Sequence, residues 1–125
     1  MTKEEMDEFL VSIGGLENGY YSGRKIDNAY FFEVNDGWYP LLKELIEKLI
    51  EKGWDRQLCQ VKEKFGGLRF YINSASDECH DLISEYENLS YETCEVCGKP
   101  GVLRSGGWLK TLCDEHANGR EPINK

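Results

Sequence analysis

Three cysteines and one histidine near the C-terminus have the residue types and the spacing of a metal-binding site. Two pairs, Cys94-x2-Cys97 and Cys113-x2-His116, are separated by 15 residues in the string CEVCGKPGVLRSGGWLKTLCDEH. This separation lies in the range typical of zinc-binding pairs. Zinc prefers four thiolate or imidazole ligands in a tetrahedron, and two intervening residues let both members of a pair reach one ion. The sequence therefore predicts one Zn²⁺ bound by Cys94, Cys97, Cys113 and His116.

All four positions of the predicted site are filled by protein side chains. A catalytic zinc ion keeps one position for water or substrate, whereas a structural zinc ion is enclosed by four protein ligands. We therefore expect this Zn²⁺ to stabilise the fold and not to catalyse a reaction. Two alternatives remain open at this point. The two pairs could form a disulfide, or the cysteines could be unrelated thiols that bind no common metal ion.

Glycines predict the turns that would bring the ligand pairs together. Gly98 directly follows the first pair, where the chain must turn sharply around the metal. Gly106-Gly107 is typical of a hairpin turn, with strands expected over residues 102–104 and 108–112. The second pair then forms the first turn of a short helix. The order of knuckle, hairpin and ligand-bearing helix resembles a treble-clef zinc finger over about residues 92–118.

The elements expected before the zinc site are helices packed on a small antiparallel sheet. Apolar residues recur at three- and four-residue steps in three segments, which indicates amphipathic helices. Two alternating runs flank Phe65-Gly66-Gly67, where glycine supplies the positive φ of a hairpin turn. The expected helices cover residues 2–13, 36–52 and 74–89, and the expected strands cover 29–34, 57–64 and 68–73.

The sequence predicts an α+β fold with two parts of different charge. Residues 1–92 form an acidic α+β domain, and residues 93–125 form a zinc-binding, treble-clef-like subdomain docked on it. The net charge is −8, and it belongs to the first part. Such a field repels nucleic acid and favours basic partners unless basic groups gather locally.

Composition favours a globular protein outside the membrane. Hydrophobic residues make up 40% of the chain, which is enough for one core. No stretch approaches the roughly 18 apolar residues of a membrane helix, and the acidic start over residues 1–8 is unlike a signal peptide. We predict a cytoplasmic location, where thiols stay reduced. Cys59 and Cys79 are then packed thiols, and His80 has no assigned role.

Basic and aromatic side chains near the two predicted hairpins form a possible contact surface for nucleic acid or another partner. Basic groups interleaved with aromatic rings can contact phosphates and stack on bases. The alternative is a hairpin whose charged residues only protect its edges. The residues concerned are Lys62, Lys64, Phe65, Arg69, Tyr71, Arg104 and Lys110.

The sequence contains none of the common catalytic motifs. There is no G-x-S-x-G, no glycine-rich phosphate loop followed by lysine and no H-E-x-x-H. One of the two histidines is already assigned to zinc, and the carboxylates show no spacing of an acid–base pair. We therefore predict that the protein is not an enzyme.

The strings DGWYPLL, QVKEKFGGLRFYI, CEVCGKPG and GGWLKTLCDEH together resemble a family of small uncharacterised proteins encoded by phages, prophages and bacteria. The resemblance covers about residues 36–117. It implies a phage or mobile-element accessory protein, which would work in the host cytoplasm, and it supplies no activity. Our leading hypothesis is a non-enzymatic protein that binds or regulates a host protein, for example as an inhibitor of a defence system. The alternative is a nucleic-acid-binding accessory protein that uses the zinc hairpin and the Lys62, Lys64 and Arg69 turn.

Overall fold

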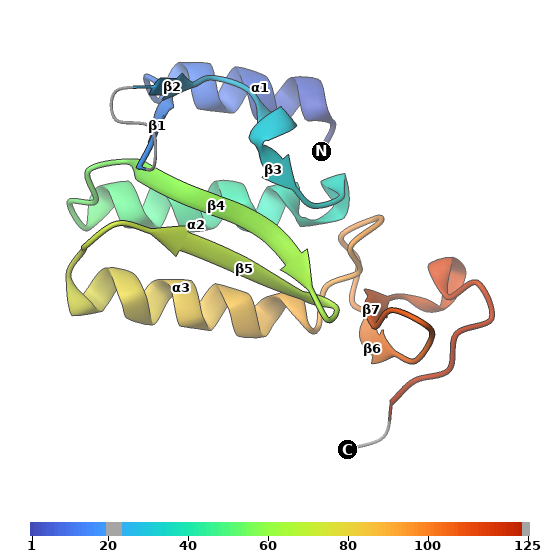
Figure 1. The fold of residues 1–125 in the computed structure, drawn as a ribbon. Helices are drawn as coiled ribbons and strands as arrows, with labels where there is room; N and C mark the ends of the chain where they lie inside the picture. The colour runs from blue at the N-terminus through green and yellow to red at the C-terminus, as the bar shows by residue number, and fades with distance from the viewer. Residues whose placement is uncertain (20–23, 124–125) are drawn as a thin grey trace.

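A computed structural model describes residues 1–19 and 24–123 and confirms the α+β class. Helices α1, α2 and α3 accompany a larger sheet, and the small β6–β7 hairpin lies near the C-terminus (Figure 1). The helices are α1 (Lys3–Ser12), α2 (Tyr39–Glu51) and α3 (Asp77–Ser90), with short 3-10 turns η1 (Ala29–Phe31), η2 (Asp36–Trp38) and η3 (Asp114–His116). The strands are β1 (Leu16–Asn18), β2 (Arg24–Ile26), β3 (Phe32–Glu33), β4 (Gln57–Lys64), β5 (Gly67–Ile72), β6 (Val102–Arg104) and β7 (Lys110–Leu112).

Strand β4 is the centre of the larger sheet. From Leu58 to Lys64 it pairs with β5 in the expected antiparallel hairpin, with Val61 opposite Phe70 and a register shift at Cys59. Its other edge pairs with β1 near the start and with β3 near the end, and both of these pairings are parallel. The sheet is therefore mixed, although most of its paired residues follow the antiparallel pattern expected from the sequence. The reason is that α2 connects β3 to β4, and a helical crossover returns the chain in the same direction.

The strand expected over residues 29–34 is shorter than predicted. Asn28 accepts a hydrogen bond from the backbone N–H of Tyr30 through its side-chain oxygen, which caps the 3-10 turn η1. Only β3 continues as strand. The Tyr20-Tyr21 part of the tyrosine-rich run before it lies outside the described residues.

The three helices begin and end close to the predicted positions. Thr2 caps α1 through a reciprocal hydrogen-bond pair with Glu5, and Ser76 caps α3 by accepting from the backbone N–H of Cys79. Helix α2 ends before Gly53, whose φ is +90°. No helix in the described part of the chain is long and apolar enough to cross a membrane.

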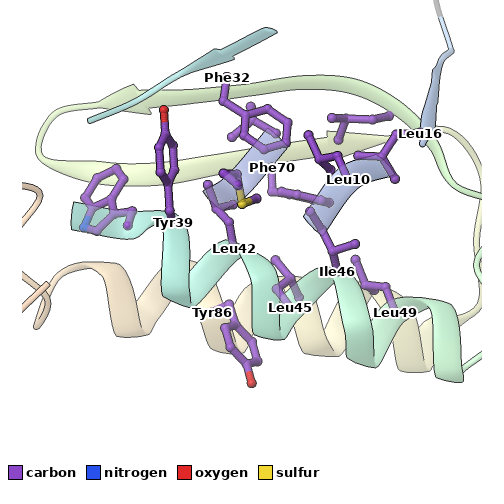
Figure 2. Close-up of a cluster of buried hydrophobic side chains, with 14 of the residues drawn as sticks. Leu10, Leu16, Phe32, Tyr39, Leu42, Leu45, Ile46, Leu49, Phe70 and Tyr86 are labelled. Atoms are coloured by element: carbon purple, nitrogen blue, oxygen red, sulfur yellow. The ribbon is translucent and has the colours of Figure 1, made fainter. Parts of the chain in front are cut away.

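The core lies between α2 and the sheet. Leu42, Ile46 and Leu49 of α2 are fully buried, and Leu10, Leu16, Phe32 and Phe70 gather against them (Figure 2). Each such side chain contributes roughly 1.5–3 kcal/mol through burial. The apolar spacing of α2 in the sequence therefore predicted the buried face correctly.

The β4–β5 turn contains two residues and not the three expected. Phe65 and Gly66 have φ values of +54° and +82°, as a two-residue hairpin turn of the primed type requires. Gly67 already belongs to β5 and pairs with Lys64. A Cβ atom at Gly67 would lie 2.2 Å from the ring of Tyr91, so this glycine permits close packing and does not form the turn.

The contact between α2 and α3 includes a polar link that can be tested. The hydroxyl of Tyr86 donates a hydrogen bond of 2.6 Å to Oε1 of Glu44. This bond, followed by the contact with Lys48, lowers the pKa of Glu44 below its ordinary 4.5. We expect Tyr86→Phe to lower the free energy of unfolding by about 1 kcal/mol at pH 7.

The effect of Tyr86→Phe should depend on pH. Because the pKa of Glu44 is depressed in the folded protein, its contribution is present above pH 4.5 and is lost as the pH falls through the lower folded value. Urea unfolding at pH 7 and below pH 4 measures this. Any loss of metal at low pH is shared by both proteins and cancels in their difference. Tyr71→Phe, at an exposed tyrosine, is the control. An equal difference at both pH values would contradict the prediction.

Candidate metal centre

The four predicted ligands converge in a compact cluster. Their ligand atoms all lie within 4.8 Å of one another. The Sγ atoms of Cys97 and Cys113 are 3.7 Å apart, and Nδ1 of His116 lies 3.8 Å from Sγ of Cys94 and 3.2 Å from Sγ of Cys113. Around a tetrahedral zinc ion, two sulfurs would be about 3.8 Å apart, and a sulfur and a nitrogen about 3.6 Å. The cluster therefore has the dimensions of a site for one metal ion.

The two alternatives left open by the sequence do not fit this geometry. A disulfide has a sulfur–sulfur distance of about 2.05 Å, whereas the Cys97–Cys113 distance is 3.7 Å. All five cysteines are free thiols. The four ligand atoms share one small volume, so the thiols of the two pairs also do not lie apart.

The first pair lies on a knuckle after α3. Gly98 has a φ of +81°, and its backbone N–H donates to the carbonyl of Cys94. This tight turn folds Cys97 back toward Cys94, as the position of the glycine in the sequence predicted. A Cβ atom at Gly98 would lie 2.9 Å from the carbonyl oxygen of Gly37, so the knuckle also contacts the turn before α2.

The second pair lies at the end of the β6–β7 hairpin, which forms over the expected residues with a shorter second strand. Cys113 follows β7, and His116 closes the 3-10 turn η3. The short helix expected here is limited to this turn. The reason is that Asn118 and Gly119 have positive φ values of +49° and +80°, which end the helical conformation.

Backbone amides prepare Cys94 to act as a thiolate ligand. Burial raises the pKa of its thiol, but hydrogen bonds from the backbone around Cys113, Cys97 and Val96 outweigh burial and lower the pKa to about 7. Amides that face the sulfurs in this way are typical of metal-binding knuckles. At Cys97 the backbone at Lys99 lowers the pKa, but burial and the neighbouring thiols outweigh this and raise it. A bound cation would replace this competition between thiols by attraction to all of them.

The metal-binding segment, about residues 93–123, is anchored to the rest of the protein at two places. At the first, Nε1 of the fully buried Trp38 donates a 2.9 Å hydrogen bond to the carbonyl of Thr93. The backbone N–H of Gly37 also donates to the carbonyl of Glu95. These bonds connect the start of α2 to both sides of Cys94.

The second anchor joins the β4–β5 turn to the β6–β7 hairpin, which lie side by side in Figure 1. Thr111 donates a buried 2.7 Å hydrogen bond to the carbonyl of Gly66. The rings of Phe65 and Trp108 stack with centroids 5.7 Å apart, and Nε1 of Trp108 donates to the carboxylate of Glu63. The two hairpins that carry the suggested contact residues therefore touch each other and form one continuous region.

The seven suggested contact residues have different environments within this region. Lys62 and Arg69 face each other across β4 and β5, and Lys64 lies over the ring of Phe65. Tyr71 and Phe65 are exposed. Lys110 forms a 2.9 Å ion pair with Glu95.

Arg104 is buried, contrary to the exposed position that a nucleic-acid contact requires. Its side chain is 6% exposed. The guanidinium donates to the carbonyls of Leu112 and Arg120 and to the carboxylate of Asp114. Arg104 therefore fixes the β6–β7 hairpin against the segment that follows His116.

We expect Arg104→Lys to destabilise the metal-binding segment by about 1–3 kcal/mol, because an ammonium cannot reproduce the three directions of the guanidinium. The rate at which a metal-loaded sample transfers its ion to a chromogenic chelator measures this, and the rate should rise. Lys52→Ala is the control, since its side chain forms an exposed ion pair with Glu78 outside the metal-binding segment. An unchanged rate in Arg104→Lys would show that the network does not stabilise the site.

Sequence reasoning missed the residues that anchor the metal centre. The sequence predicts only a helical position for Trp38, and it predicts no role for Glu63 or Glu95. A glycine–tryptophan pair before α2 has no local pattern that points to a contact with Thr93, 55 residues away. Only the spatial arrangement of the two parts identifies them.

The fold and the site together define an α+β protein with a compact Cys3His cluster that can hold one metal ion. Comparisons with protein-family models, with curated proteins and with solved structures find no match. The function is therefore inferred from the geometry of the chain itself.

Proposed function

We propose that the protein is a zinc-stabilised, non-enzymatic accessory protein that binds a host protein. The observation that carries the zinc part is the convergence of three sulfurs and one imidazole nitrogen within 4.8 Å. Soft thiolate ligands with imidazole in a tetrahedron favour Zn²⁺ over Mg²⁺, Ca²⁺ or Mn²⁺. With four protein ligands the ion has no free position for a substrate, so its role is structural.

Metal analysis of the purified protein tests the zinc assignment. We expect one zinc per chain, and replacement by Co²⁺ should give the visible absorption of a tetrahedral site with thiolate ligands. Cys94→Ser should remove most of the bound metal, whereas Cys59→Ser should keep it, because Cys59 lies in β4 beside Asn73. Protein that contains no zinc, or a disulfide within the cluster, would overturn the assignment.

Two surface features support protein binding. The stacked rings of Phe65 and Trp108 are about half exposed, and rigid aromatic side chains often dominate the energy of protein interfaces. The net charge of −8 favours a basic partner. The resemblance of the VKEKFGGLRFYI and CEVCGKPG segments to phage-encoded proteins supports a partner in the bacterial host, for example a component of a defence system.

Affinity capture from bacterial lysate tests the binding of a host protein. The zinc-loaded chain should retain a specific protein, and a Phe65→Ala, Trp108→Ala double variant should retain at least tenfold less. Val11→Ala is the control, because Val11 is an exposed apolar residue of α1. The hypothesis fails if both variants capture the same proteins in the same amounts.

One observation favours the nucleic-acid alternative. Lys62 and Arg69 are register partners on β4 and β5, so two positive side chains start from one face of the hairpin, and the Arg69 guanidinium is held by the hydroxyl of Tyr91. A phosphate could contact this face, and the exposed Tyr71 lies two residues after Arg69. Binding of single-stranded DNA or RNA should then weaken steeply with salt and fall further in Lys62→Gln. Absence of salt-dependent binding would exclude this alternative.

A further inference from the structure

A cavity of about 380 Å³ lies between the metal-binding segment and the larger sheet. Its walls come from β3 and the loop that follows it, the end of β4, the knuckle and β7. Charged side chains on these walls are Glu33, Glu63, Glu95 and Lys110, with Asn35 and Trp38 beside them. The cavity is large enough for one long side chain or a small ligand.

Glu95 is the unusual residue of this cavity. It is 2% exposed although it lies between two predicted metal ligands on a surface loop. Its Oε1 accepts hydrogen bonds from Nδ2 of Asn35 and Nζ of Lys110, at 3.2 Å and 2.9 Å. Its Oε2 is buried and accepts no hydrogen bond from the described residues. A buried carboxylate oxygen without a donor is costly, so this wall lacks one hydrogen-bond donor.

The charges on the walls favour a cation. Three carboxylates face one ammonium, which leaves a charge of −2 in the cavity. The carboxylate of Glu63 already accepts from Trp108 and from the backbone N–H of Gly66, and Glu33 is exposed at the rim. The cavity therefore has one carboxylate exposed at its rim, on Glu33, and one buried in its wall, on Glu95.

We propose that this cavity binds one guanidinium group, supplied by an arginine side chain of a basic partner protein. The proposal rests on the proposed function, because it specifies the chemistry of that partner. A guanidinium carries five donors in a planar fork and is weakly hydrated, so it can enter a half-enclosed cavity and bridge two carboxylates. The terminal torsion of glutamate is soft, and a small rotation of Glu95 would present an oxygen to it.

Other cations fit the cavity less well. Lys110 already lies on Oε1 of Glu95, and its ammonium would repel a doubly charged metal ion at the same carboxylate. A lysine from a partner would have to give up a strongly held hydration shell. Trp38 and Phe32 on the same walls are buried, so part of the lining is apolar, which suits the weakly hydrated guanidinium better than an ammonium.

Titration of the zinc-loaded full chain with three capped tripeptides tests the proposal. The peptides are Gly-Arg-Gly, Gly-citrulline-Gly and Gly-Lys-Gly, and the readout is the set of backbone amide signals in two-dimensional NMR. We expect the arginine peptide to shift the signals of Asn35, Glu95 and Lys110 in a saturable way. Its affinity should be at least tenfold higher than that of the neutral citrulline peptide and severalfold higher than that of the lysine peptide.

A matched pair of variants separates the cavity from general attraction to the acidic surface. Glu33→Gln, at the rim, should weaken the arginine peptide severalfold, and Glu95→Gln should weaken it more if the metal site stays intact. Glu47→Gln removes the same charge from an exposed position on α2 and should leave the affinity unchanged. Equal binding of arginine and citrulline peptides, shifts at other surfaces, or equal effects of Glu33→Gln and Glu47→Gln would overturn the proposal.

The outcome is separable from that of the proposed function. If a host protein is captured but the arginine peptide does not bind, the guanidinium site is wrong and the accessory function stands. If the peptide binds at the cavity and no host protein is captured, the cavity recognises guanidinium but the accessory function is wrong.

Discussion

Chelation of the metal should unfold the C-terminal segment while the larger sheet and its helices remain folded. The buried apolar cluster of this segment, among the described residues, consists of Cys94, Leu112 and Cys113. Two of these three residues are predicted ligands, so little hydrophobic burial remains without the ion. A structural zinc site contributes on the order of 10 kcal/mol, which is more than any other single interaction in the segment can supply.

The measurement is amide NMR and thermal unfolding of the full chain before and after treatment with a strong chelator. Signals from about residue 93 onward should collapse toward unfolded positions, and those of α2 and β4 should persist. Cys113→Ser should reproduce the effect without a chelator, and Cys79→Ser, at a buried thiol of α3, should not. A zinc-free protein with unchanged spectra and melting temperature would refute the structural role of the metal.

Trp38→Ala should be the most damaging single substitution outside the ligands. The side chain is fully buried at the edge of the main core, and its indole N–H donates to the carbonyl of Thr93 in the metal-binding segment. Loss of a buried tryptophan costs about 3–5 kcal/mol, because the cavity that remains cannot collapse fully. The carbonyl of Thr93 also loses its donor, which adds the cost of an unsatisfied group.

Trp38→Phe distinguishes the two parts of this effect, since it keeps most of the ring and removes only the hydrogen bond. It should cost about 1–2 kcal/mol and speed zinc transfer to a chelator. Trp54→Phe is the control, because Trp54 packs on Phe70 in the larger core and away from the metal centre. Zinc transfer at the same rate in all three proteins would show that Trp38 does not anchor the metal-binding segment.

The anchoring contacts explain why the metal could influence a distant surface. Thr111 and Trp108 belong to the segment that the proposed ion would stabilise, and both contact the β4–β5 turn through Gly66, Glu63 and Phe65. The cavity beside Glu95 also has one wall from that segment. Loss of zinc would therefore disrupt both the proposed aromatic contact and the proposed guanidinium site.

The division into an acidic domain and a zinc subdomain remains a prediction of the sequence, as do the cytoplasmic location and the absence of enzymatic activity. The contacts at Trp38, Gly37 and Gly66 describe how the two segments meet. The chelation experiment addresses the division directly, because independent folding of residues 1–92 is its expected result.

The sequence by itself determined the features that depend on neighbouring residues. The ligand spacing predicted the Cys3His cluster, the apolar period of α2 predicted its buried face, and the helix starts expected at residues 2 and 74 lie close to the observed starts of α1 and α3. Each depends on residues a few positions apart, where chain geometry fixes which side chains can meet. These predictions agree with the structure because the tertiary fold does not override them.

The tertiary structure decided everything that depends on contacts between distant segments. The parallel pairing of β1 and β3 with β4, the burial of Arg104 and the cavity around Glu95 are examples. Glu95 has the same type as the many solvated glutamates of this acidic chain, and only the approach of Asn35 and Lys110 makes it a buried acceptor. The burial of a side chain and the hydrogen-bond donors around it depend on segments that are distant in the sequence. No local pattern in the sequence could therefore assign them.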